Sequence, residues 1–289
     1  MNINLEKITD LLTFLLEKNN YYYEEYKNLI NEIEYSFSYW DDSKAQWLNK
    51  SLNEIKIKYE SLFEELDSVS DIYRTLENKY SVLGNKISFN KENSEDLINL
   101  MSEISDNTSI LLSEYSYLNL NSYIEVRNRL EKQKEKIKKT TNDMTKMFLD
   151  AKDTIRKIND NETEIKNKIS NTSISPIEEL TTSDITTQQV DNIAFEPDEM
   201  QLTLEKVNLS KNSLEVIVDE INDKLKETEE FYKTSNKKEL ETLLDNLNNK
   251  MMKLRNINNF ITNLIQESIE NYTEAILKIK EMSKDLSEG

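Results

Sequence analysis

The sequence predicts an all-α protein made of three antiparallel hairpins of long amphipathic helices, arranged as a bundle or an elongated array. Three observations lead to this fold class. The chain of 289 residues contains only two glycines and two prolines, far fewer than a β or mixed α/β protein needs to reverse its strands. Apolar residues recur at steps of three and four, the period of one helix face. The apolar positions of residues 5–80 also recur without a gap at residues 197–272, which indicates a structural repeat.

The first hairpin is expected over residues 1–85, with helices over about residues 5–38 and 44–83. Between them, one of the residues Asp41-Asp42-Ser43 is expected to accept free backbone N–H groups as the N-cap. Gly84 is expected to end the second helix, because glycine tolerates the left-handed conformation common at helix ends. The break is short, so the two helices should fold back antiparallel.

A second, divergent hairpin is expected over residues 90–170, because the apolar stripe of the first hairpin recurs there at an offset of 78 residues. Its first helix should begin near residue 93. Ser122 and Glu125 have the spacing of a capping box for its second helix. This segment therefore reads as another copy of the same unit.

Residues 171–196 have a different composition, rich in serine, threonine and asparagine and without a sustained apolar stripe. We expect an exposed or disordered linker, with docking of its isolated apolar residues on a hairpin as the alternative. The third hairpin is expected over residues 197–286. It opens with Pro197, a favoured first residue of a helix.

Composition excludes several classes of function. The net charge of −18 and the pI near 4.6 argue against nucleic acid and anionic membranes as partners. The basic segment over residues 127–139 is expected to be a solvated helix face. Without cysteine and histidine, the chain has no disulfide, thiol nucleophile, histidine metal site or Ser–His dyad.

Motifs for catalysis and for a membrane span are also missing. The sequence has no phosphate-binding glycine loop, no nucleophile motif and no calcium loop, so we expect no enzyme, no cofactor and no metal. The apolar stretch over residues 11–16 is too short for a signal peptide or a membrane span. We therefore expect a cytoplasmic protein, or one secreted without a conventional signal peptide, and no membrane insertion.

Aromatic residues are concentrated around the first helix reversal. One interpretation is that they form the core of the hairpin. The other is an exposed patch that anchors a partner, because tyrosine and tryptophan dominate interface hot spots. The candidate partner-binding residues are Tyr22, Tyr23, Tyr39, Trp40, Asp42 and Trp47.

The segment from Tyr39 to Leu48 (YWDDSKAQWL) resembles the reversal of the WXG family. These are ESAT-like helical-hairpin proteins handled by the type VII secretion systems of Gram-positive bacteria. Trp40 matches the family tryptophan, and Asp42 stands where the family usually has glycine. Trp47 resembles the aromatic residue that opens the second helix. The chain would then be a divergent tandem array of such hairpins.

The resemblance implies association, usually as dimeric four-helix packing, with toxins or secretion components as clients. We therefore expect a non-enzymatic module for protein–protein interaction that binds a helical client as a type VII substrate, partner or chaperone, in a homo- or hetero-oligomer. A cytoplasmic coiled-coil scaffold is the alternative. A helical pore-forming toxin is less supported, because the sequence has no long apolar hairpin to insert.

Overall fold

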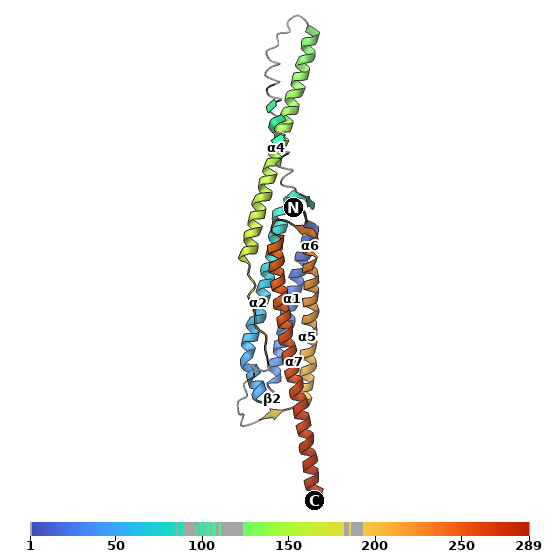
Figure 1. The fold of residues 1–289 in the computed structure, drawn as a ribbon. Coiled ribbons are helices and arrows are strands. Elements are labelled where there is room, and N and C mark those ends of the chain that lie inside the picture. Colours follow the sequence, from blue (N-terminus) through green and yellow to red (C-terminus); the bar gives the residue numbers. More distant parts are fainter. Residues whose placement is uncertain are drawn as a thin grey trace.

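The structure is a computed structural model that describes residues 2–84, 86–88, 124–181 and 193–288, with isolated positions between residues 96 and 110 and at residue 185. Four long helices form an elongated bundle (Figure 1). The all-α fold class is confirmed. The bundle helices are α1 (Leu5–Ser36), α2 (Ser43–Tyr80), α5 (Pro197–Lys226) and α7 (Lys237–Glu288).

Helices α1 and α2 make the N-terminal hairpin close to its expected bounds. Asp42 is the N-cap of α2: its side chain accepts a hydrogen bond of 2.8 Å from the backbone N–H of Ala45, which stabilises the helix start. A 3₁₀ turn, η1 (Ser81–Leu83), follows α2. Gly84 follows this turn as its C-cap, with a φ of 101°. Residues with a side chain rarely adopt this backbone conformation.

Helices α5 and α7 make the C-terminal hairpin. Pro197 is the first residue of α5, and two acidic residues follow it in the first turn, where they interact favourably with the helix dipole. A short helix, α6 (Thr228–Phe231), lies at the reversal. Helix α7 continues beyond the bundle and is described as far as Glu288 (Figure 1).

The two hairpins pack against each other in one core. Helix α1 contacts α2 and α5, and α7 contacts α5 and α2. The reversals of the two hairpins lie at opposite ends of the bundle (Figure 1), so neighbouring helices among these four are antiparallel. The bundle therefore has an approximate twofold symmetry that relates residues 192 positions apart in the sequence.

Short strands close both ends of the bundle and follow the same symmetry. Before α1, β1 (Asn2–Asn4) pairs with β5 (Tyr232–Lys233) at the C-terminal reversal and with β3 (Lys86–Ser88). At the other end, β4 (Ala194–Phe195) precedes α5 and pairs with β2 (Trp40–Asp41) at the N-terminal reversal. Ile3 faces Tyr232, and Phe195 faces Trp40. The strand that precedes the first helix of each hairpin therefore pairs with the strand at the reversal of the other hairpin.

In the described residues of the middle of the chain, the long helix is α4 (Ile124–Asn171). Near its C-terminal end, Ile158, Ile165 and Ile169 are buried, and α4 contacts α2 and α7. Residues 124–157 project past the end of the bundle (Figure 1), and we name this part the arm. The start of the expected first helix at residue 93 and the capping residue Ser122 lie outside the described residues.

The segment after α4 docks on the bundle. Residues 172–181, which we name the strap, have no regular secondary structure. The strap's Ile177 is buried. Lys253 of α7 donates a hydrogen bond of 2.9 Å to the carbonyl of Ile177, and Lys58 of α2 donates one of 3.2 Å to that of Glu178. This part of the expected linker therefore takes the alternative, docked arrangement.

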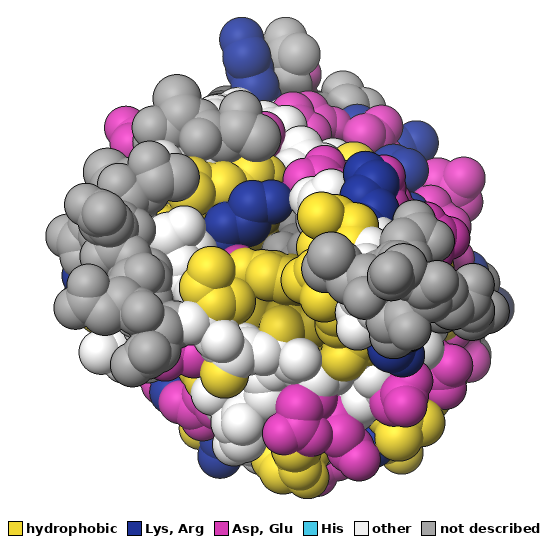
Figure 2. Space-filling view, turned by 90° about the horizontal axis from the view of Figure 1, so that it is seen from below, with side chains coloured by type: hydrophobic (Ala, Val, Ile, Leu, Met, Phe, Trp, Pro, Cys, Tyr) yellow, Lys and Arg dark blue, Asp and Glu magenta, His cyan; other side chains and the backbone are white. Residues whose placement is uncertain are grey.

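The bundle end that carries β2 and β4 places apolar side chains at its centre. Seen from this end, hydrophobic side chains lie in the middle of the face with a lysine or arginine side chain among them, and most charged side chains lie toward the rim (Figure 2). Trp40 and Phe195 pack on the core here, the tryptophan fully buried. The amphipathic helices bury one apolar stripe each in the shared core, while the side chains that Figure 2 shows at this end are exposed.

Six tyrosines are buried in the described core, which makes the fold sensitive to alkaline pH. Burial raises the pKa of Tyr26 and of Tyr232 to about 12 and that of Tyr22 well above its ordinary value. A tyrosine whose folded pKa exceeds its unfolded pKa stabilises the fold fully below about pH 10, and this stabilisation is lost as the pH rises through the folded pKa.

We therefore expect the helicity to persist up to about pH 10 and to fall steeply above it, in a titration followed by far-ultraviolet circular dichroism. Tyr22→Phe should move the midpoint to higher pH, because it removes one of the buried groups that ionise on unfolding. The change breaks no hydrogen bond in the structure, since the Tyr22 hydroxyl has no partner there. Tyr21→Phe, a change at an exposed position, is the control and should leave the midpoint unchanged. An identical midpoint in all three proteins would contradict the expectation.

Candidate functional site

Trp40 lies inside the bundle and not on its surface. Its side chain is 1% exposed, and its strand is paired with the strand that precedes α5. The tryptophan therefore closes the end of the bundle, and in this conformation it offers no surface to a partner. Tyr232 occupies the equivalent position at the other end and is equally buried.

Asp42 links the N-terminal reversal to α7. One carboxylate oxygen caps α2, and the other accepts a hydrogen bond of 2.8 Å from the hydroxyl of Tyr272. The Tyr272 ring stacks on Phe195, with the ring centres 4.3 Å apart. Partial burial, together with the hydrogen bond to the Asp42 carboxylate, raises the pKa of Tyr272. Asp42 is thus a structural residue that joins three segments.

The other candidates are divided between core and surface. Tyr22 and Trp47 are buried, and Trp47 makes an edge contact with Phe260 of α7, 6.0 Å between ring centres. Tyr23 and Tyr39 are partly exposed. Four of the six candidates therefore belong to the core of this fold, which leaves only Tyr23 and Tyr39 accessible to a partner.

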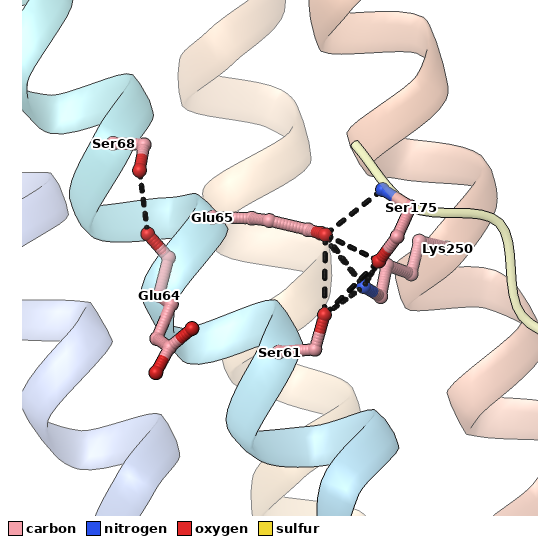
Figure 3. Close-up of polar contacts among 6 residues, drawn as sticks. All are labelled: Ser61, Glu64, Glu65, Ser68, Ser175 and Lys250. Atoms are coloured by element: carbon pink, nitrogen blue, oxygen red, sulfur yellow. Dashed lines mark hydrogen bonds and ion pairs between the residues drawn. The ribbon is translucent and has the colours of Figure 1, made fainter. Parts of the chain in front are cut away.

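A buried polar cluster that the sequence analysis did not identify lies between α2, α7 and the strap. Figure 3 shows Glu65 of α2 and Lys250 of α7 pointing toward each other, with Ser61 and Ser175 around them. Both Glu65 oxygens lie 2.8 Å from the Lys250 ammonium. The hydroxyls of Ser61 and Ser175 lie 2.7 and 2.9 Å from it. We name these four residues the clasp.

The clasp holds the strap in place. The backbone N–H and the hydroxyl of Ser175 both donate to Glu65, at 2.9 and 2.7 Å. Lys250 is 2% exposed, and its ammonium donors all face acceptor oxygens of the cluster. A serine beside a lysine serves catalysis when the lysine is free to accept a proton, whereas Lys250 is paired with a carboxylate. The arrangement suits a structural role.

One sequence signal marks the clasp in retrospect. Leu247, Lys250 and Leu254 follow one another at steps of three and four on the buried face of α7. A lysine in an apolar stripe needs a buried counter-charge. Glu65 is likewise a charged residue within the apolar stripe of α2, beside Leu62 and Leu66. The pairing of Lys250 with Glu65 depends on how the two hairpins pack against each other, and the apolar pattern of a single helix does not specify this packing.

An apolar heptad pattern runs along α4 and begins in the arm. Ile137, Met144, Ala151, Ile158 and Ile165 follow each other at steps of seven, the repeat of helices that pack along a shared seam. The last two are buried on the bundle, whereas Ile137 is exposed. Met147 and Leu149 are also exposed, the methionine by 66%. The arm therefore combines a packing pattern with accessible apolar side chains.

The described part of the chain shows no group of acidic side chains able to hold a metal ion. Within the same residues, no helix is both long and apolar enough to cross a membrane. No protein-family model matches the chain, and neither a curated protein nor a solved structure is significantly similar to it.

Proposed function

We propose that the chain is a non-enzymatic, WXG-like module for protein–protein interaction that binds a helical client in type VII secretion, as substrate, partner or chaperone. The observation that carries the proposal is the packing of the two hairpins in one bundle with their reversals at opposite ends. The resemblance to the WXG family implies four-helix packing of two hairpins. In this chain, both hairpins come from one polypeptide.

The internal pairing of the hairpins determines where a client would bind. Each hairpin buries its apolar face against the other, and Trp40 is buried with them. A client therefore has to use other surfaces. The arm is the most suitable one, because it projects from the bundle and exposes Ile137, Met147 and Leu149. A helical client would pack along the arm as a further helix.

Charge supports the same surface. The chain carries a net charge of −18, but residues 127–139 of the arm are basic. Opposite charges on two partners accelerate their encounter and favour the correct pairing. We therefore propose an acidic helical protein as the client, bound in the cytoplasm or after export without a conventional signal peptide.

The test is affinity capture with the full chain as bait and purified helical proteins encoded beside its gene as candidate clients. Ile137→Asp combined with Met147→Asp should reduce retention of a client by about tenfold or more, because both changes place a charge in an apolar interface. The control is Leu202→Asp combined with Val216→Asp, at exposed positions of α5, which should retain the client as the unchanged chain does. Equal retention by all three baits would contradict the arm as the binding surface.

The alternative is a coiled-coil scaffold without a role in secretion, and the heptad pattern of the arm favours it. A scaffold of this kind would pair the arm with the arm of a second copy. Sedimentation equilibrium distinguishes the two functions. The scaffold would replace the proposed function if the unchanged chain self-associates, the arm variant does not, and the capture experiment retains no client.

A further inference from the structure

A cavity of about 280 Å³ opens between the two helices of the C-terminal hairpin, next to its reversal. Leu225 of α5 and Leu240 and Leu244 of α7 contribute apolar surface, and Tyr232 adds an aromatic wall. Charged side chains, among them Glu229, stand around it. Eight of the twelve lining residues are polar or charged, and the other four are leucine or tyrosine. A concave site that combines apolar surface with polar groups is a candidate ligand pocket.

The approximate symmetry of the bundle shows what fills the equivalent place in the N-terminal hairpin. Glu229 corresponds to Phe37, and Tyr232 corresponds to the larger Trp40. Phe37 packs against the core, and Trp40 is fully buried. The N-terminal hairpin therefore supplies an additional aromatic ring from its own chain at a position where the C-terminal hairpin has an exposed acid.

We propose that this cavity is a binding site for an aromatic side chain of a protein partner. The inference rests on the proposed function, because it assigns a second contact to the same kind of client. A cavity of roughly 150 Å³ is large enough to hold benzene, so a cavity of about 280 Å³ has room for a phenyl or indole ring. Among the apolar lining residues, Leu244 is only partly buried and offers the inserted ring open surface, whereas Tyr232 is 1% exposed and forms part of the wall.

Charge at the edge of the cavity is compatible with a ring that enters on a peptide. Lys226 and Lys237 both line the site, as do Glu229, Glu241 and Asp245. Lys237 pairs with Glu241 at 3.1 Å. The charged side chains of the lining thus offer both donors and acceptors for the polar backbone around an inserted side chain, and the leucine side chains supply apolar contact for the ring.

The probe for the test is N-acetyl-tryptophan amide, added to the full chain and followed by methyl NMR. We expect saturable shifts of the Leu225, Leu240 and Leu244 methyl signals, with no change at Leu48 of the N-terminal hairpin. N-acetyl-leucine amide should bind more weakly by about tenfold, because its smaller side chain buries less apolar surface in the cavity. Absence of shifts at the three leucines, or equal binding of the two probes, would overturn the inference.

Glu229→Phe provides the matched variant, because it copies the residue of the N-terminal hairpin. The added ring should fill the cavity, raise the melting temperature and weaken probe binding by about tenfold or more. Glu230→Phe adds the same ring at the exposed neighbouring position and should leave binding unchanged. Leu244→Phe fills the site from the opposite helix, so the test survives if Glu229→Phe does not fold. Unchanged probe binding in both filled variants would overturn the inference.

The same variants separate this inference from the proposed function. Probe binding needs no client, so a failed capture experiment with intact probe binding would overturn only the proposed function and would support the cavity as an aromatic site. Where a client is captured, Glu229→Phe should weaken its retention by about tenfold. Retention that Glu229→Phe leaves unchanged would overturn the role of the cavity in partner binding.

Discussion

Lys250→Met is expected to lower the free energy of unfolding by about 3–5 kcal/mol, because it leaves the Glu65 carboxylate buried without its counter-charge. The Lys250 ammonium contacts both Glu65 oxygens and two serine hydroxyls, so the variant removes all of these interactions at once. Urea unfolding followed by circular dichroism measures the change. We also expect faster proteolysis in the strap, since Ser175 is bound to Glu65 and Lys250.

Two controls separate the buried charge from other effects. Lys278→Met removes a lysine from an exposed pair with Glu274, and such pairs contribute about 0–1 kcal/mol. Glu65→Leu combined with Lys250→Met replaces both charges by apolar side chains and should recover much of the lost stability. A Lys250→Met protein as stable as the unchanged chain would show that the clasp does not stabilise the bundle.

Trp40→Ala is expected to cost about 3–5 kcal/mol of stability, because it removes a large, fully buried side chain and leaves a cavity at the end of the bundle. The change also weakens the region where β2 pairs with β4. Tyr232→Ala, at the symmetry-related position, should have an effect of the same sign. Thermal and urea unfolding of the full chain measure both variants.

The control for Trp40→Ala is Tyr35→Ala, near the same reversal but 47% exposed, for which we expect a change within about 0.5 kcal/mol. This comparison also tests the two interpretations of the aromatic cluster. Loss of client retention by Trp40→Ala at unchanged stability would indicate a direct contact and would contradict the core position. Loss of stability comparable to that of Tyr232→Ala is the result that the structure predicts.

Local features of the sequence predicted the helices well. The bounds of α1 and α2 follow from the steps of three and four between apolar residues, and Pro197 marks the start of α5. Asp42 was one of three candidate caps, and its side chain makes the capping bond. These features depend on neighbours within one or two helical turns, so no knowledge of the packing was needed.

The site residues were predicted less well for a physical reason. An aromatic residue at a helix reversal can be buried in the core or can be exposed and bind a partner. The residues next to it in the sequence do not distinguish these two arrangements. Trp40 is buried because a strand from residues 194–195 pairs beside it. That strand is more than 150 residues away in the sequence, so its approach is a property of the folded bundle.

By itself, the sequence determined the fold class, the positions of the two reversals and the 192-residue repeat, because helical periodicity is a local property of the chain. The tertiary structure alone decided that the first and third hairpins cover one another. It also decided that strands are exchanged between their ends and that Lys250 meets Glu65. An amphipathic stripe shows that a helix needs a partner, but the identity of the partner depends on the shape and charge of every other face.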